Sequence, residues 1–309
     1  MKKVGNEKVM MNNVQRAKGM LWGLVVGDCL GSPIQFSDKD DHPQITEMEP
    51  CPVFGLPPGY WTDDSSMAFC VMDSFIEKGG YDLKDIANNF VRWYEHGFWS
   101  SVEGSSFDVG CATANACHAI RRGSLVNGSE ESQGNGSIMR FAPSYLIGKY
   151  VAERGGGGTR RPTPVGSDLR AARKVMYEIS DLTHASGRVH AVVDKMAKVL
   201  DDHLSGARTG ETSAYATRDE VNVSGWAVST LEAALWAFHS TTTFEEGMIA
   251  AVNLGGDSDS TGAVFGQIAG AFYGFDAIPK RWIRKVKSPA DVENEINCFL
   301  SKVLTTEEN

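Results

Sequence analysis

Apolar residues recur at every third or fourth position along most of this chain, which is the spacing of one face of an α-helix. Such stripes run through residues 21–29, 67–76, 86–94, 175–182, 192–200 and 231–238. Few stretches alternate apolar and polar residues over four or more positions, and none is a Val-, Ile- and Thr-rich run between turn residues. The pattern therefore predicts an all-α protein.

Breaks in this periodicity indicate where loops are expected. Small and polar residues replace the apolar stripe over residues 154–166 and 205–219, which predicts two surface loops. Neither loop separates halves of contrasting composition, so we expect a single domain over residues 15–309. Residues 1–14 are mostly polar and are expected to form a disordered leader or a short arm that docks on another protein.

One predicted helix, residues 261–274, has glycine at every fourth position. Gly262, Gly266, Gly270 and Gly274 leave one helix face without side chains. In a membrane this face would suggest a helix dimer, but the segment is too short to span a bilayer. Each glycine costs about 0.5–1 kcal/mol of helix stability relative to alanine, so we expect the bare face to serve close packing inside the fold.

Composition and charge narrow the class of protein. The 309 residues include 30 Lys and Arg against 39 Asp and Glu, a net charge of −9, which disfavours binding to nucleic-acid phosphates. No apolar run reaches the ~20 residues that cross a membrane, and no signal peptide is recognisable, so we expect a cytoplasmic protein. The six cysteines include no CxxC pair, which argues against a zinc site or a disulfide framework.

Two clusters of acids and hydroxyls lie where a loop meets a predicted helix: Thr62, Asp63 and Asp64, and Asp257, Asp259 and Ser260. In one interpretation each cluster caps its own helix, a role worth about 0.5–2 kcal/mol that needs only one acid per helix. In the other, the clusters share a cation, because a second unpaired carboxylate is costly to bury. Oxygen ligands without His or Cys suit Mg²⁺, Mn²⁺ or Ca²⁺, and two metals bridged by a carboxylate are compatible with this set.

Residues 134–140, with the sequence GNGSIMR, form a third candidate segment. Two glycines permit close approach to the backbone, whose N–H groups there are suited to holding a phosphate or a ribose. An ordinary tight turn before a capped helix explains the same residues, so both interpretations stay open.

Together these segments resemble the ADP-ribosylglycohydrolase family, which includes dinitrogenase-reductase-activating glycohydrolase and the ADP-ribosylarginine hydrolases. The resemblance covers about residues 15 to 275 and rests on six motifs in the family's order: GLVVGDCLG (23–31), WTDDS (61–65), FDVG (107–110), GNGSIMR (134–140), TH (183–184) and GGDSDST (255–261). It implies a compact, single-domain orthogonal helical bundle with two Mg²⁺ or Mn²⁺ ions at the bottom of a cleft. The implied metal ligands are Thr62, Asp63, Asp64, Asp257, Asp259 and Ser260.

The resemblance also implies a groove for ADP-ribose, lined by Phe107, Asp108, Gly110, Gly134, Asn135, Gly136, Ser137 and His184. The implied catalytic positions are Asp63, Asp108 and Gln35. Asp108 resembles the family acid that meets the opened ribose or the departing group. Gln35 stands where the family commonly has an acid, and a glutamine cannot take up a proton at neutral pH. Either another carboxylate such as Asp63 assumes that role, or this chain is catalytically impaired.

The activity that the resemblance implies is metal-dependent removal of ADP-ribose from modified protein side chains, foremost arginine, which reverses mono-ADP-ribosylation. The implied partners are an ADP-ribosylated protein as substrate, ADP-ribose as product and an ADP-ribosylating toxin against which the enzyme protects. Two alternatives stay open. One is hydrolysis of another ADP-ribose linkage, to serine, a nucleobase or a small molecule; the other is an ADP-ribose-binding protein without turnover, which Gln35 favours.

Overall fold

The computed structural model of the chain describes residues 2–154 and 169–304, with side chains in the first helix only from residue 12. This part of the chain contains α-helices, short 3-10 helices and no strand, so the all-α prediction is confirmed. The predicted loop at 205–219 is irregular up to residue 217, also as expected. The predicted loop at 154–166 lies, after its first residue, outside the described residues, and the boundary at residue 14 stays a prediction.

The α-helices, in chain order, are α1 (Lys2–Gly31), α2 (Asp63–Lys78), α3 (Leu83–His96), α4 (Cys111–Ile120), α5 (Phe141–Arg154), α6 (Arg170–Asp181), α7 (Gly187–Leu204), α8 (Ala227–Ser240), α9 (Phe244–Val252), α10 (Ser258–Tyr273), α11 (Lys280–Lys285) and α12 (Pro289–Val303). The 3-10 helices are η1 (Ser32–Ile34), η2 (Asn135–Ser137), η3 (Arg218–Glu220) and η4 (Phe275–Ala277). Each of the six predicted apolar stripes lies within, or within a residue of, one of these helices.

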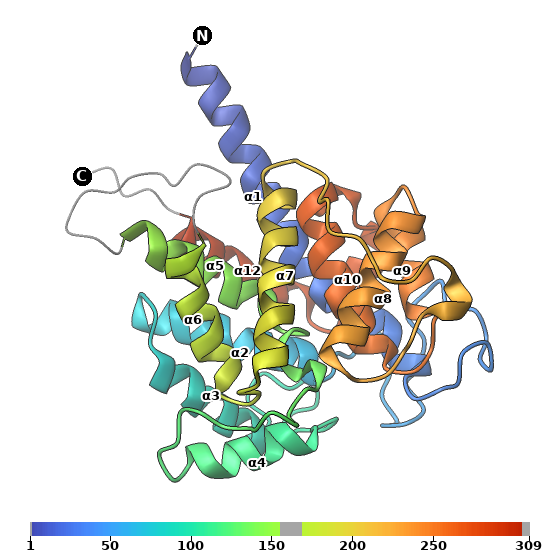
Figure 1. Ribbon diagram of the computed structural model, residues 1–309, viewed down its shortest axis with the longest axis horizontal. Coiled ribbons are helices and arrows are strands. Elements are labelled where there is room, and N and C mark those ends of the chain that lie inside the picture. Colours follow the sequence, from blue (N-terminus) through green and yellow to red (C-terminus); the bar gives the residue numbers. More distant parts are fainter. Residues whose placement is uncertain (1, 155–168, 305–309) are drawn as a thin grey trace.

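Helices α1 and α10 form the centre of the fold (Figure 1). Helices α7, α8 and α9 pack against α10, while α2 and α12 pack against α1 and against each other. The apolar faces of these helices meet in one large core, in which Trp22, Trp93 and Trp282 are fully buried. Burial of such a core is the main favourable term in folding.

Glycines on both central helices explain how closely α1 and α10 approach. A Cβ atom built on Gly23 would lie 2.1 Å from Gly266 O, and one on Gly27 would lie 2.0 Å from Gly262 O. The relation is reciprocal, because a Cβ atom on Gly266 would lie 1.9 Å from Gly23 O. Real Cβ atoms do not approach an oxygen this closely, so only glycine fits. The expected role of the bare face in close packing is confirmed.

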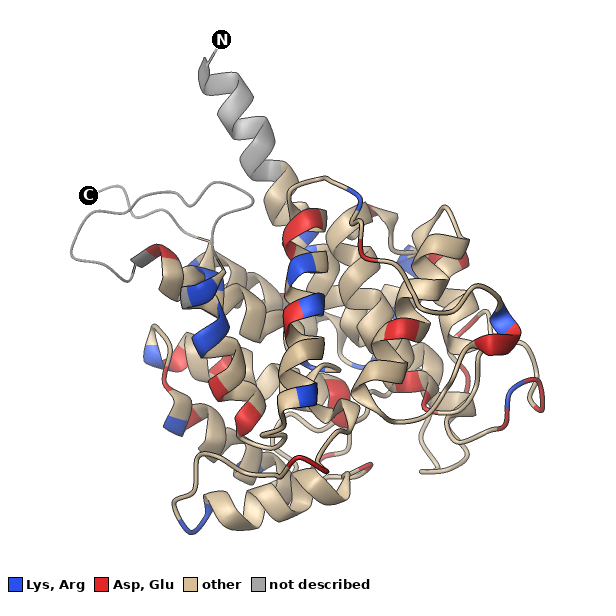
Figure 2. Cartoon of the chain, in the orientation of Figure 1, with Lys and Arg blue, Asp and Glu red and all other residues tan. Residues whose placement is uncertain are grey.

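Charged residues are distributed over the outer helices. Figure 2 shows Lys and Arg mixed with Asp and Glu along the length of α7. Mixed charge of this kind is typical of a solvated helix face rather than of a basic nucleic-acid-binding stripe. Within the described ranges, no helix is both long and apolar enough to cross a membrane.

Candidate active site

A cleft of about 570 Å³ opens where the starts of α2, α4 and α10 meet the loop at η2. Its lining includes ten of the residues that the sequence singled out: Asp63, Asp108, Gly110, Gly134, Asn135, Gly136, His184, Asp257, Asp259 and Ser260. The glycine contact between α1 and α10 helps to bring the two acidic clusters together. At its end, Ser258 Oγ donates to Gly31 O at 2.8 Å, which fixes the start of α10 beside the end of α1.

Asp28 holds the start of the first acidic cluster in place through hydrogen bonds. Sequence reasoning did not single it out as a site residue. Its fully buried carboxylate accepts hydrogen bonds from Thr62 N and Oγ1, both at 2.9 Å, and from Ser65 N and Oγ at 3.0 and 2.6 Å. Burial nevertheless raises the pKa of Asp28 to about 6. An acid within the apolar stripe of 21–29 was a signal for such a role, because an unpartnered buried charge is costly.

Among the acids of the two clusters, Asp259 accepts a backbone N–H at the start of its own helix, with Oδ1 2.9 Å from Ser260 N. Asp28, from another helix, satisfies backbone N–H groups at the start of α2, and the N-cap residue Thr62 makes no side-chain cap bond. Asp257 is the N-cap residue of α10 and makes no such bond either. Capping contacts therefore account for only part of the two clusters, and Asp63, Asp64 and Asp257 need another explanation.

The clustered carboxyl groups raise one another's pKa. Burial is the largest cause for Asp63, Asp64 and Asp259, each of which has a pKa well above its usual range. Repulsion between these acids and from Asp108 and Asp257 adds to that effect. One oxygen of Asp64, Oδ1, is buried without a hydrogen-bond partner. The cleft thus concentrates acidic groups, and the buried Arg140 guanidinium, which interacts with Asp63 and Asp64, offsets part of their repulsion.

The buried side chain of Gln35 contacts two of these acids, Asp108 and Asp259. When the side-chain amide is oriented so that both its oxygen and its nitrogen face suitable partners, the nitrogen donates to Asp108 Oδ2 at 2.9 Å and to Asp259 Oδ2 at 3.0 Å. Asp108 itself has a left-handed backbone (φ 57°), which is strained for a non-glycine residue. Burial raises the pKa of Asp108 to about 6. Gln35 therefore holds both carboxylates without adding a further negative charge.

The loop at η2 lies against the second acidic cluster. Asn135 Nδ2 donates to Asp257 Oδ2 at 2.7 Å and to Thr230 Oγ1 at 3.1 Å, and Asn135 N donates to Gly225 O at 3.0 Å. A Cβ atom on Gly136 would lie 2.6 Å from the His184 ring, so the loop can approach the imidazole only because it has no side chain there. The glycines thus shape one wall of the cleft.

His184 lies at the end of a chain of hydrogen bonds. Arg140 Nη2 donates to Thr183 Oγ1 at 2.9 Å, and Thr183 Oγ1 lies 2.7 Å from His184 Nδ1. In the tautomer in which the threonine hydroxyl donates to Nδ1, Nε2 carries the imidazole hydrogen and lies at the glycine loop. Burial, reinforced by the Arg140 charge, lowers the pKa of His184 to about 3. His184 is therefore a neutral hydrogen-bond donor, and Arg140 is a further site residue that sequence reasoning missed.

The remaining predicted residues lie behind the lining. Thr62 is fully buried; its hydroxyl oxygen lies 2.9 Å from Asp28 Oδ1 and 3.2 Å from Asp64 Oδ2, and its single proton is shared between them. The hydroxyl of Ser137 donates to Ser180 Oγ at 2.7 Å and does not line the cleft. The ring of Phe107 packs 5.4 Å from that of Phe54, which does line it.

The donor set fits hard divalent cations. It consists of carboxylates, two hydroxyls and no cysteine, which suits Mg²⁺ or Mn²⁺ better than zinc. As the side chains lie in the described ranges, no three His, Cys, Asp or Glu residues already form a closed metal-ligating group. A cation would nevertheless relieve the repulsion among the crowded acids and would give the unpartnered Asp64 oxygen an interaction partner.

Known proteins are similar to this chain over most of its length. The family model of ADP-ribosylglycohydrolase matches residues 10–308. The ADP-ribosylarginine hydrolase Tri1 of Pseudomonas putida (strain GB-1) is 35% identical over 295 residues, which cover 88% of this chain and 74% of that protein. The ADP-ribosyl-dinitrogen reductase glycohydrolase of Rhodospirillum rubrum is 28% identical over 306 residues, which cover 93% of this chain and 96% of that protein.

A solved structure, that of an ADP-ribosylglycohydrolase-related protein complex, has the same fold. It matches with a TM-score of 0.76 and 30% sequence identity, covering 95% of this chain and 99% of that chain. The match over nearly all of both chains confirms the expected helical bundle. The chain therefore belongs to the ADP-ribosylglycohydrolase family of hydrolases.

Proposed function

We propose that this protein hydrolyses the bond between ADP-ribose and arginine side chains of modified proteins, with Mg²⁺ or Mn²⁺ in the cleft. The observation that carries the proposal is that Asp63 of the first acidic cluster and Asp257, Asp259 and Ser260 of the second line one cavity, which a glycine loop walls on one side. The cavity volume lies within the range of small-molecule sites. The similarity to Tri1, an ADP-ribosylarginine hydrolase, supports arginine as the acceptor.

Thr62, Asp63, Asp64, Asp257, Asp259 and Ser260 are the residues that would hold the cations. Bound there, the cations would supply charge compensation and Lewis acidity at the reacting end of the ribose. Asn135 would keep Asp257 in place through its 2.7 Å hydrogen bond, and Asp28 would keep Thr62 in place from below. Partners of this kind orient metal ligands and tune their affinity.

The glycine loop and His184 would bind the ADP-ribose part of the substrate. Neutral His184 offers an Nε2 hydrogen to a phosphate or hydroxyl oxygen, while Gly134 and Gly136 let the ligand approach the backbone. Because the pKa of His184 is lowered to about 3, this donor does not change its charge near neutral pH. The binding contribution of His184 should therefore be independent of pH between about 5 and 8.

In the reaction, the bond between the anomeric carbon of the ribose and a guanidine nitrogen breaks, and a water oxygen bonds to that carbon. Asp63 would accept the proton of the water, because Gln35 cannot. Asp108 would face the departing guanidine and supply its proton, since burial raises the Asp108 pKa to about 6. Carboxylates around the cleft would stabilise the positive charge that develops on the sugar.

The acceptor is tested by incubating the protein and Mg²⁺ with two peptides, one ADP-ribosylated on arginine and one on serine. We expect release of ADP-ribose from the arginine-linked peptide at a rate at least about tenfold higher, a difference of ~1.4 kcal/mol in activation free energy. Preference for the serine-linked peptide would assign the enzyme to another linkage. Tight binding of ADP-ribose without release from either peptide would favour the binding-protein alternative, which Gln35 suggests.

Divalent cations should stabilise the protein more at about pH 7.5 than at about pH 5. The pKa values of Asp28 and Asp108 are raised to about 6 in the folded state, from 3.8. The stability that these two acids contribute is fully present below the pKa that they have in the unfolded chain. It is lost as the pH rises through about 6, where both carboxyl groups ionise in the folded protein. A bound cation offsets that loss.

The measurement is the change in melting temperature on adding Mn²⁺ at the two pH values, with a monovalent salt of equal ionic strength as the control. An equal change at both pH values, or none at either, would contradict this electrostatic account of the cleft.

The role of an ADP-ribosylating toxin as the source of the modified arginine stays a prediction. A short docking arm at residues 1–14 is the alternative to a leader that would suit such a contact, and side chains before residue 12 lie outside the described part of the protein.

A further inference from the structure

The turn Gly255–Asp257, which positions Asp257 at the cleft, is held by backbone hydrogen bonds from two separate loops. Gly256 N donates to Ser37 O at 2.8 Å, and Phe36 N donates to Gly256 O at 2.6 Å. From the other side, Asp257 N donates to Val223 O at 3.1 Å. The position of Asp257 therefore depends on where the segment 36–45 and the segment 216–223 lie relative to each other.

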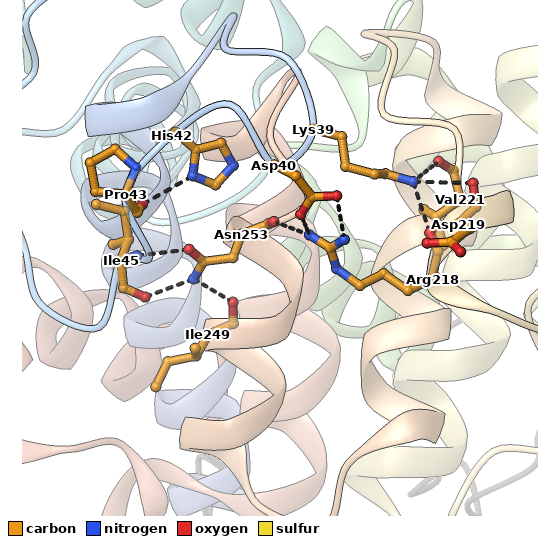
Figure 3. A network of polar contacts seen from close by, with 10 residues as sticks. All are labelled: Lys39, Asp40, His42, Pro43, Ile45, Arg218, Asp219, Val221, Ile249 and Asn253. Carbon is orange, nitrogen blue, oxygen red and sulfur yellow. Dashed lines mark hydrogen bonds and ion pairs between the residues drawn. The ribbon is translucent and has the colours of Figure 1, made fainter.

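Each segment has one positively charged side chain that contacts the other segment (Figure 3). Lys39 Nζ donates to the carbonyl oxygens of Arg218, Asp219 and Val221, at 2.8, 3.4 and 2.9 Å. In return, the Arg218 guanidinium contacts both carboxylate oxygens of Asp40, at 2.6 and 2.9 Å. We call this reciprocal pair of contacts, made by Lys39, Asp40 and Arg218, the clasp.

The clasp is also anchored to the helix that precedes the turn. Arg218 Nη2 donates to the backbone oxygen of Asn253 at 2.9 Å. The Asn253 side chain donates to Ile45 O and accepts from Ile45 N, both at 2.7 Å, which fixes the far end of the first segment (Figure 3). Both segments are thus tied to the end of α9, three residues before the turn.

Backbone strain marks the same segment. Phe36 and Asp40, on either side of Lys39, have left-handed backbones with φ of 64° and 68°. Such conformations cost about 1 kcal/mol or more each and persist only where the surroundings enforce them. The strain at Phe36 accompanies a half-exposed ring that lines the cleft, with 61% of its surface exposed. The strain at Asp40 accompanies the carboxylate that pairs with Arg218.

The clasp itself does not touch the cleft. Asp40, Arg218 and Asn253 line a different hollow of about 550 Å³, and none of them, nor Lys39, lines the candidate active site. Any effect of the clasp on the reaction must therefore pass through the backbone of the Gly255–Asp257 turn and through Phe36.

We propose that Lys39 and Arg218 are positioning residues that fix Asp257 and Phe36 for the reaction in the cleft. This inference rests on the proposed function, in which Asp257 is a ligand residue. Without Lys39 the Arg218–Asp40 pair is the remaining side-chain contact of the clasp between the two segments. The hydrogen bonds of the Gly256 and Asp257 amides then open more often, and Asp257 samples positions away from the other acids.

The test compares the full-length protein with Lys39→Ala, Lys39→Arg and Lys302→Ala. Lys302 is a matched control, because its Nζ also donates to a backbone carbonyl, that of Ile76 at 2.6 Å, and joins α12 to the end of α2 rather than the segments of the clasp. The first readout is amide hydrogen exchange over residues 255–257, which reports on the turn whether or not the protein is active. The second is kcat and KM for ADP-ribose release, and the third is the dissociation constant for Mn²⁺.

In Lys39→Ala we expect exchange at Gly256 and Asp257 to be about tenfold faster, and kcat and Mn²⁺ affinity to fall about 10- to 100-fold. The melting temperature should change by less than about 3 °C, since Lys39 is not part of the core. Lys39→Arg should recover most of the loss, because a guanidinium also reaches several carbonyls. Lys302→Ala should match the parent in all three readouts.

Unchanged exchange in Lys39→Ala would overturn the positioning role, and so would faster exchange with unchanged kcat in an active protein. If the parent itself releases no ADP-ribose, the proposed function fails separately. The clasp is then judged by amide exchange and Mn²⁺ affinity, and parent-like values of both in Lys39→Ala would refute it.

Discussion

Asp63→Asn and Asp257→Asn should each lower the rate of ADP-ribose release by about a thousandfold or more, because each removes a charge at the centre of the cleft. Both side chains line the cavity, and neither caps a helix, so their charge is free for the reaction. An asparagine keeps nearly the same shape and leaves one oxygen acceptor. The loss should therefore be chemical rather than structural.

The stability of the same variants separates these two explanations. Asp63 is buried among repelling acids, and its pKa is raised well above the usual range. Removing its charge should leave the melting temperature of the cation-free protein equal or slightly higher, as is common where an active site is strained for function. Circular dichroism and thermal melting provide the measurement, and the exposed acid Asp276 provides a matched control as Asp276→Asn. Full activity in either site variant would contradict the proposed role of the cluster.

Gly23→Ala and Gly266→Ala should each destabilise the fold by about 3 kcal/mol or more, at the upper end of overpacking effects. An added Cβ atom would lie 2.1 Å and 1.9 Å, respectively, from the backbone oxygen of the facing helix. A backbone oxygen in the middle of a helix cannot move aside, so α1 and α10 would have to separate. Because this contact aligns the start of α10 with the end of α1, activity should fall as well.

The measurement is chemical denaturation followed by circular dichroism. Gly80→Ala is the matched control, because a Cβ atom there would meet nothing within 4 Å and the position has no left-handed backbone. It should change the free energy of unfolding by less than about 0.5 kcal/mol. A parent-like midpoint in Gly23→Ala would show that the helices have room to separate.

Local patterns in the sequence predicted a large part of this fold. A stripe at helical spacing reflects one buried face, so helices such as α2, α7 and α8 could be anticipated from their own residues. The partner of the bare face on α10 could not be assigned in the same way. Its signal is nonetheless present, since Gly19, Gly23, Gly27 and Gly31 repeat the same four-residue spacing.

The candidate site was predictable where its residues are clustered in motifs. Asp63 and Asp257 each stand next to another acid or hydroxyl at a helix start, which is a local signal. Asp28 acts through a tertiary contact with the start of α2, and Arg140 acts through Thr183. Such roles depend on which helices pack together, and one sequence does not determine that packing by inspection.

The clasp is another feature that could not be predicted from the sequence, because it depends on tertiary contacts. Lys39 and Arg218 lie in loops almost 180 residues apart, as the contact between Arg218 and Asp40 illustrates. In the sequence, both stand next to acidic residues in polar segments, a pattern typical of solvated surface. Only the fold brings these side chains together behind Asp257.

The most direct test of the central claim is release of ADP-ribose from an arginine-ADP-ribosylated protein by the parent chain, measured with Mg²⁺, with Mn²⁺ and with EDTA. Gln35→Glu is measured beside it, because the family commonly has an acid at this position. We expect release by the parent with either cation and none with EDTA. Absence of release by the parent under all three conditions, with or without release by Gln35→Glu, would contradict the proposed activity of this chain.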